Sequence, residues 1–448
     1  MRKTTVSILV SMSSLAPLAQ ASGFLEDSKV STSARTLYFE HDIREPNGVD
    51  QRQTDLGLRL DAISGFTSGS VGFGVDVLGL TGINLGGGLS SQSASSVNTV
   101  TPVDSDGHPV SSWSRLGANV KAKISDTELK VGSALAPNLP VVVANDGRVL
   151  PQIFEGAAIT STEINGLKIN AGKLTHAAGR ASTNYSGLTV SGATKGSNSF
   201  YYAGADWKVT PDLMLQYYFA QLSDFYNQNF LGGIYNYKIS DGQYLKTDIR
   251  YFHSTPDGRA GNTGYVFNNA GGYASKPGEA KNDTWSAFFT YGLGGHAFTL
   301  GHQRISGDGA MPYISNNNLR DGEGRHEGEG GSTVYLFTDS MINSFVRAGE
   351  RTTFGQYIYD FAASGVPGLK ASVTYLHGDN IKDARGNGQE YSEWERDYRI
   401  DYAFQQGFLK DFAVSLRRAN YRSEIPVAQG ASDTDQTRLY LVYTHSFK

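Results

Sequence analysis

The chain of 448 residues contains no cysteine. Disulfide bonds, which hold many small exported domains together, are therefore excluded. Long apolar runs are also missing: after the first 21 residues, no segment offers the ~20 consecutive apolar residues that a membrane-spanning helix needs. The mean hydropathy of −0.33 points the same way. A bundle of transmembrane helices is therefore excluded.

A strong excess of charge is absent as well. The formal net charge is −4 at pH 7, a near-neutral total that argues against nucleic-acid binding. The nine histidines show no metal-site spacing, and no nucleophile elbow, P-loop or dinucleotide-binding motif is present. We therefore expect a protein that is not an enzyme and that has no cofactor, no metal site and no nucleic-acid partner.

The first 21 residues have the pattern of a secretory signal peptide. Arg2 and Lys3 give a positive start, a short apolar stretch follows, and Ala19-Gln20-Ala21 is a small-x-small cleavage site. The apolar stretch is too short and too interrupted by serine to span a bilayer. Export is therefore expected, with 22–448 as the mature chain.

Apolar and polar residues alternate down most of the remaining chain. Leu56, Leu58 and Leu60 are spaced by two, and the same spacing recurs in Val71–Val77 and Leu213–Phe219. A period of two predicts β-strands with one apolar face. Because a closed barrel pairs every strand edge, it also explains how an exported chain without disulfides is held together.

The strands can be counted from their connections. Bacterial barrels have short periplasmic turns and longer extracellular loops. Eight short turns rich in Gly, Pro, Asn, Asp and Ser alternate with nine longer polar stretches, which predicts eighteen strands. The fold class is therefore all-β: one transmembrane antiparallel β-barrel over residues 22–448, in the bacterial outer membrane. A large soluble β-protein is the alternative, but it does not explain aromatic residues at the outward ends of strands.

Two long loops stand out. Residues 137–151 contain an apolar stretch, Leu139 to Ala144, which we expect to bury by folding into the lumen and narrowing the pore. Residues 307–350 form a long extracellular loop. Val334–Val346 within it resembles a strand, but counting it as one would put the turn at Gly365-Val366-Pro367-Gly368 on the outside, so we assign it to the loop.

Several local sequences resemble the OprD family of outer-membrane channels. The resemblance covers essentially the whole mature chain and implies eighteen strands, a narrowing third loop and a ladder of basic residues that guides carboxylate-bearing solutes. The matching segments are Gly23–Ser28, Arg35–Phe39, Ser64–Leu80, Leu150–Gln152, Ile164–Leu167, Arg347–Arg351, Tyr359–Ala363, Gly365–Leu369, Gly378–Ile381 and Trp394–Asp397.

Strand parity gives the residues that face the lumen. Apolar neighbours facing lipid leave Arg59, Arg399, Arg417 and Arg438 pointing inward, and the family resemblance adds Arg35. These five arginines would lie on five consecutive strands and form one basic wall. Arginine binds carboxylates bidentately and stays charged at any working pH, so such a wall suits the stepwise passage of anions. The alternative is that each arginine merely faces water and balances a nearby acid.

Other polar residues complete the expected pore. Asp146 in the third loop, and Asp308 in the seventh, are candidates for an acidic side that holds a substrate ammonium opposite the ladder. Asp146 is equally compatible with a simple Asn-Asp-Gly turn. Parity also directs three further side chains into the lumen, Lys121, Lys130 and Tyr440.

The sequence thus predicts a passive porin that prefers small carboxylates, such as amino acids or aromatic acids. A general porin of low selectivity is the alternative, and a barrel enzyme such as a lipase or protease is a weaker one. The expected partners are small carboxylate solutes, outer-membrane lipid and lipopolysaccharide, and the barrel-assembly machinery. The expected oligomeric state is a monomer or a loose trimer.

Overall fold

The computed structural model describes residues 23–46, 48–89, 99–104, 107–316 and 333–447. The expected signal peptide lies outside the described residues. No helix among the described residues is long and apolar enough to cross a membrane.

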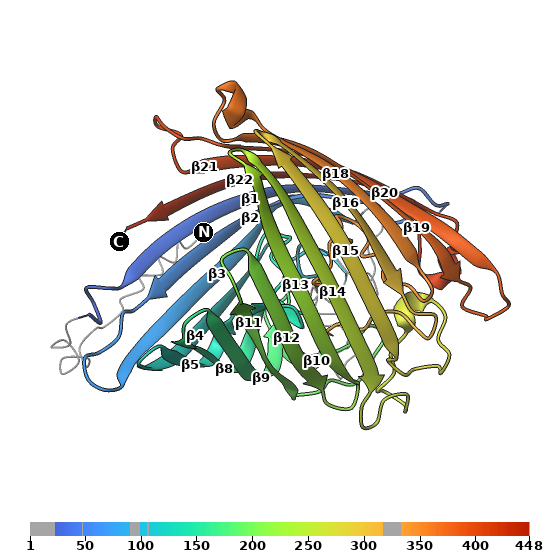
Figure 1. The fold of residues 1–448 in the computed structure, drawn as a ribbon, viewed down its shortest axis with the longest axis horizontal. Helices are drawn as coiled ribbons and strands as arrows, with labels where there is room; N and C mark the ends of the chain where they lie inside the picture. The colour runs from blue at the N-terminus through green and yellow to red at the C-terminus, as the bar shows by residue number, and fades with distance from the viewer. Residues whose placement is uncertain (1–22, 47, 90–98, 105–106, 317–332, 448) are drawn as a thin grey trace, which may run out of the picture.

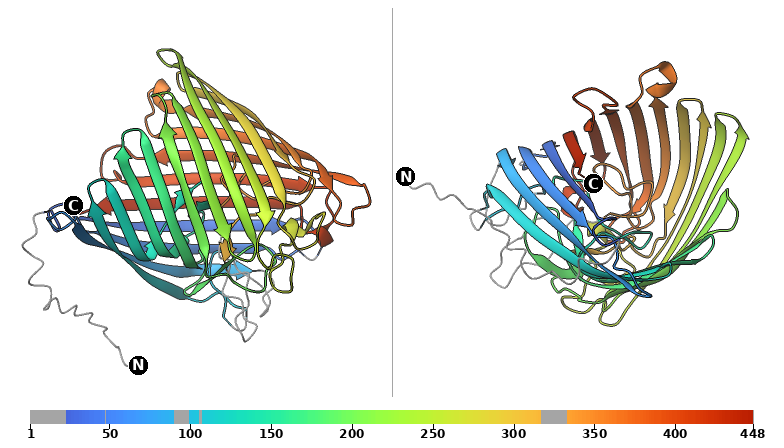
Figure 2. Two further views of the ribbon diagram at one scale, coloured as in Figure 1. Left: turned by 60° about the horizontal axis from the view of Figure 1, so that its bottom comes forward. Right: turned by 90° about the vertical axis from the view of Figure 1, so that its left-hand side faces the viewer.

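Eighteen antiparallel strands form a closed barrel (Figures 1 and 2). Each wall strand pairs with its neighbours in the chain, and the last strand pairs with the first over thirteen positions, from Ser31↔Ser446 to Ile43↔Thr434. The predicted eighteen-stranded barrel is therefore confirmed. The wall strands are β1 Lys29–Ile43, β2 Gln51–Ile63, β3 Gly72–Leu89, β4 Ser112–Ile124, β5 Thr127–Leu135, β8 Ile153–Ile164, β9 Leu167–Ala178, β11 Phe200–Lys208, β12 Leu213–Leu222, β13 Tyr226–Ser240, β14 Gln243–Pro256, β15 Asn282–Leu293, β16 His296–Ile305, β18 Arg351–Asp360, β19 Leu369–Lys382, β20 Glu390–Ala403, β21 Phe412–Ser423 and β22 Thr434–Ser446.

Four short strands lie in the long loops rather than in the wall. They are β6 Asn138–Leu139, β7 Val142–Val143, β10 Tyr185–Thr189 and β17 Ser315–Asn316. The short turns close the other end of the barrel. Two of them, Asn165-Gly166 and Asp241-Gly242, join their strands through only two residues and need a positive φ, which glycine supplies: Gly166 has φ +77° and Gly242 has φ +76°.

The alternation explains the outer face of the barrel. On β4, Leu116 and Val120 are 72% and 64% exposed, whereas Asn119 and Lys121, on either side of Val120, are buried inside. Exposed apolar side chains on a closed barrel form the surface that meets lipid. Parity thus sorts each strand into a lipid face and a lumen face.

The lumen face is not uniformly polar, contrary to the expectation from parity. On β9 to β14 many inward positions are apolar or aromatic, and loop side chains pack on them, although buried polar residues such as Asn170, Gln216 and Asp248 lie on the same strands. This apolar cluster fills one side of the barrel interior. Its members include Leu174, Phe200, Tyr218, Phe230 and Phe252 from the wall, and Val141, Val142, Met311, Ile314, Val334 and Leu336 from the loops.

The segment Val334–Val346 contains no strand, and the next wall strand begins at Arg351. Phe345 within it is fully buried against Phe288, Phe354 and Leu376 of the wall. Its backbone has φ +54°, a left-handed conformation that costs a bulky residue about 1–2 kcal/mol. Burial of the aromatic ring offsets that strain, so this part of the seventh loop is packed inside the barrel.

Candidate functional site

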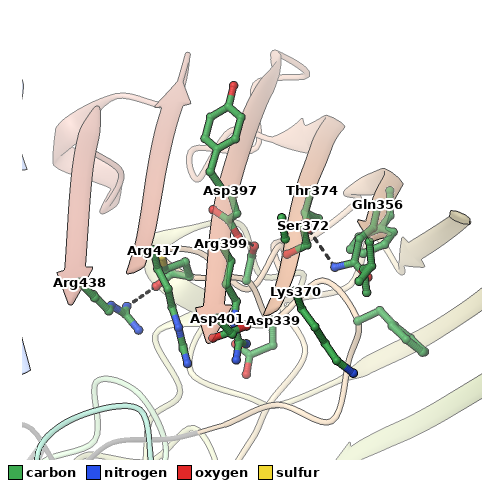
Figure 3. Close-up of a pocket in the computed structure, with 17 residues that line it drawn as sticks. Asp339, Gln356, Lys370, Ser372, Thr374, Asp397, Arg399, Asp401, Arg417 and Arg438 are labelled. Carbon is green, nitrogen blue, oxygen red and sulfur yellow. Dashed lines mark hydrogen bonds and ion pairs between the residues drawn. The ribbon is translucent and has the colours of Figure 1, made fainter. Parts of the chain in front are cut away.

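The five arginines lie on five neighbouring strands, β20, β21, β22, β1 and β2. Arg399 is the cross-strand partner of Arg417, and Arg417 is the partner of Arg438. Cross-strand partners have Cβ atoms about 4.5–5.5 Å apart. Three guanidinium groups are therefore anchored side by side on one wall, and Figure 3 shows them reaching toward the same hollow.

Three of the five guanidinium groups are paired with carboxylates. Arg59 contacts Asp61 through two bonds of 2.6 and 2.8 Å, and Arg399 donates to Asp401 at 2.6 Å. Arg35 is paired with a loop residue described below. An arginine that is already paired with an acid contributes little net charge to the pore. These three positions therefore form polar walls more than free anion sites.

Arg438 and Arg417 differ from the other three. Arg438 is only 6% exposed and donates to neutral oxygens, the side chain of Gln436 at 2.6 Å and the backbone of Met341 at 2.5 Å. Arg417 donates to the hydroxyl of Ser415 at 3.0 Å and lies 4.8 Å from the ring centroid of Tyr440. It has no carboxylate within ion-pair distance among the described residues. Arg417 is thus a partly buried cation whose guanidinium still has unused N–H donors.

Arg417 lines two adjoining hollows in the lumen. One, of about 430 Å³, reaches Phe337 and Met341 of the seventh loop. The other, of about 600 Å³, reaches Gly368 and Gln405 at the short turns. Arg399, Asp401 and Lys370 also line both. Arg417 therefore lies where the loop-side hollow and the turn-side hollow meet.

Lys370 is a lumen residue that strand parity did not single out. It lies on β19 with its ammonium 3.0 Å from Asp360, and it points into the hollow of Figure 3. The alternation of Leu369, Lys370 and Ala371 indicates that Lys370 faces inward. These residues open the strand, where strand boundaries are hardest to place from sequence.

The third loop meets the ladder instead of facing it across the pore. The Arg35 guanidinium binds both carboxylate oxygens of Asp146, at 2.6 and 3.0 Å, and also the carbonyl of Arg148 at 2.8 Å. The hydroxyl of Tyr440 donates to the Gly147 carbonyl at 3.0 Å. We expected Asp146 to form an acidic side opposite the ladder. The structure instead places Asp146 on the ladder wall itself, bound to Arg35.

Apolar packing explains the position of Asp146. Val149 and Leu150, which follow it in the loop, are buried against Leu37 and Phe39 on the inner face of β1. This contact draws the loop tip onto the ladder wall, where Asp146 meets Arg35. Asp146 nevertheless lines the same hollow as Arg399 and Arg417. Its negative charge therefore lowers the positive electrostatic potential that these arginines create there.

The other expected site residues lie elsewhere. The Asp308 carboxylate is 3.5 Å from Lys281, and the Asp308 carbonyl accepts from the Ser275 amide, both in the preceding loop. The structure thus does not bring Asp308 to the ladder. Lys121 and Lys130 point inward but clamp one acid, Asp76, at 2.7 and 3.0 Å.

The position of Asp146 in the hollow predicts that its charge affects the ion selectivity of the channel. Asp146→Asn removes one negative charge from the hollow and frees Arg35. We expect the preference for chloride over potassium to rise, by up to about fivefold for an electrostatic change near 1 kcal/mol. The measurement is the reversal potential of single channels in a KCl gradient. Asp308→Asn is the matched control and should leave it unchanged; an equal shift in both variants would contradict the assignment.

Loop seven is held inside by acids that sequence reasoning did not select. Glu395 is fully buried, and its two carboxylate oxygens accept from the backbone amides of Ile342 and Asn343, each at 2.8 Å. Glu393 accepts from the Asn343 side chain at 2.5 Å, and Asp397 accepts from the Ser340 hydroxyl at 2.5 Å. These three acids share the parity of Arg399, so the alternation carried that signal.

The loop contributes an acid of its own. Asp339 accepts from the Ser344 hydroxyl at 2.7 Å and from the Val334 amide at 3.1 Å. Burial raises the pKa of Asp339 to about 6, although these bonds and the positive charges of Arg180 and Arg438 oppose the shift. Because the unfolded-state pKa is lower, protonation of Asp339 below about pH 6 favours the docked loop.

No group of three or more His, Asp or Glu side chains in the described part of the chain could hold a metal ion. The arginine row on β20, β21 and β22 instead borders the two hollows.

Comparisons with known proteins agree with this architecture. The family model described as "outer membrane porin, OprD family" matches residues 22–447. Porin D of Pseudomonas aeruginosa is 32% identical over 440 residues, which cover 95% of this chain and 92% of that protein. The porin-like protein GalP of Pseudomonas putida is 31% identical, with coverage of 95% and 93%.

Solved structures give the same result. The crystal structure of Pseudomonas aeruginosa OccK8 (OprE) is 42% identical and superposes with a TM-score of 0.83, covering 95% of this chain and all of that one. Pseudomonas aeruginosa OpdK, solved with vanillate, is 31% identical with a TM-score of 0.81 and the same coverage. The protein is therefore a channel of the bacterial outer membrane and not an enzyme, and it belongs to the OprD family of outer-membrane porins.

Proposed function

We propose that this porin passes small carboxylate-bearing solutes by passive diffusion along the wall formed by β20, β21 and β22. The observation that carries the proposal is the row Arg399, Arg417 and Arg438, in which Arg417 has no carboxylate partner among the described residues. A free guanidinium fork matches the two oxygens of a carboxylate.

The shape of the lumen supports the same route. Apolar packing by the third and seventh loops fills the side lined by β9 to β14, so the solvated space is left beside the arginines. One loosely held anion site between two hollows favours entry without trapping the solute. The vanillate in the OpdK structure is itself an aromatic carboxylate, which fits this chemistry.

The test compares two solutes of similar size that differ in charge. Purified protein in liposomes would be given glucuronate or glucose, with potassium and valinomycin present so that no membrane potential opposes the anion. We expect glucuronate to enter several-fold faster at low ionic strength, and the difference to shrink at high salt because mobile ions screen the row. Equal rates at low salt would instead support a general porin of low selectivity.

A further inference from the structure

Two arginines on the outer face of the barrel have no partner among the described residues. Arg304 near the end of β16 and Arg351 at the start of β18 are directly opposite each other across the strand pair. Both side chains are exposed, and neither makes a hydrogen bond or ion pair with any residue that the structure describes. The two strands lie side by side in Figure 1. This pair is called the rim pair below.

The rim pair sits at the extracellular end of the lipid-facing surface. It belongs to the loop end of both strands, away from the short turns. Trp285 of β15 is the cross-strand partner of Arg304, and its ring is 5.7 Å from that of His302. Outward tryptophans mark the level of the lipid headgroups. The rim pair therefore lies where headgroups of the outer leaflet reach the protein.

Neither arginine of the rim pair forms an ion pair with an acid in the described part of the chain. Asp379 on β19 is the cross-strand partner of Arg351, yet the two side chains are not within ion-pair distance. His302 and His377 lie one outward position closer to the membrane on β16 and β19. Like charges placed directly opposite each other in a sheet are destabilising.

Two other outer arginines at this end of the barrel are paired with acids. Arg52 on β2 is 3.3 Å from both Glu40 and Asp42, and Arg44 is 2.5 Å from Asp435. The rim pair thus lacks the ion pair that each of these two arginines makes with an acid, as far as the described residues show. An anion from outside the protein would remove the repulsion and use the free donors.

We propose that Arg304 and Arg351 bind a phosphate group of a phosphorylated glycolipid of the outer leaflet, of the lipopolysaccharide type. Phosphate accepts bidentate hydrogen bonds from the guanidinium fork, and two adjacent forks supply donors to one phosphate. Trp285, directly opposite Arg304, would contact the same lipid at the level of its headgroup. The site lies on the outer face and is separate from the solute path.

The test measures binding of bis-phosphorylated lipid A to the detergent-purified full barrel by native mass spectrometry. We expect the double variant Arg304→Gln/Arg351→Gln to raise the Kd for lipid A about tenfold. This factor corresponds to the loss of charge-assisted hydrogen bonds worth about 1.4 kcal/mol. The matched control Arg44→Gln/Arg52→Gln removes two paired arginines from the same rim and should leave lipid binding within about twofold. Unchanged single-channel conductance in both double variants shows that the barrel is intact.

Three results would overturn the proposal. The first is equal lipid A affinity in the wild type and the rim-pair variant. The second is an equal loss in the control variant. The third is equal binding of lipid A without phosphates, or of phosphatidylglycerol, which would show that a phosphorylated glycolipid is not what the rim pair recognises.

Discussion

Replacing Arg417 by glutamine should reduce the uptake of glucuronate about tenfold while the uptake of glucose stays the same. The guanidinium of Arg417 has unused donors, faces the hollows and has no carboxylate partner among the described residues, and a bidentate bond to a carboxylate is worth about 1.5–3 kcal/mol. Its neighbours differ: Arg399 is paired with the Asp401 carboxylate through its Nε, and Arg438 is buried and donates to Gln436 and Met341. Loss of Arg417 therefore removes the anion site and not merely one charge among five.

Two further variants separate charge from geometry. Arg417→Lys keeps the positive charge but loses the planar fork, so chloride selectivity should be largely retained while the preference for glucuronate falls. The double variant Arg35→Gln/Asp146→Asn removes an ion pair from the same hollow with no change in net charge, and it should have little effect on either solute. If Arg417→Gln leaves the glucuronate-to-glucose ratio unchanged, Arg417 is not the anion site.

The alternation of the sequence predicted the barrel because a period of two is a local property. Strand number, turn positions and the inward direction of Arg399, Arg417 and Arg438 all follow from it. Parity says nothing of partners that are distant in the chain. Arg35 meets Asp146 across 111 positions, and that contact depends on the packing of Val149 and Leu150 against β1.

The apolar filling of the lumen escaped prediction for a related reason. Inward Phe200, Tyr218 and Phe230 look like mismatches to a pattern in which the lumen is polar. They are apolar because loops, not water, cover them. Whether a loop folds inward is decided by the match between two surfaces that are remote in sequence, and a single strand's pattern records only one of those surfaces.

Releasing the seventh loop from the inside of the barrel should change the single-channel conductance. In Glu395→Ala, the backbone amides of Ile342 and Asn343 lose their acceptors inside the barrel, at a cost of about 1–3 kcal/mol each. We expect the docked loop to become one of several conformations, so that single channels show a larger mean conductance and frequent transitions between levels. Glu395→Gln retains one acceptor oxygen in a side chain of the same size and should give an intermediate result.

A second variant distinguishes loss of anchoring from loss of charge. Phe345→Ala leaves Glu395 in place but removes the ring that packs on Phe288, Phe354 and Leu376, and truncation of a buried phenylalanine costs about 3–5 kcal/mol. If the acid acts by anchoring the loop, both alanine variants should show the same fluctuating conductance. If Glu395→Ala alone changes the current, and only through ion selectivity, the acid acts through its charge and the anchoring role is wrong. Because the docked loop also supplies the Met341 carbonyl that holds Arg438, its release should disturb the arginine row as well.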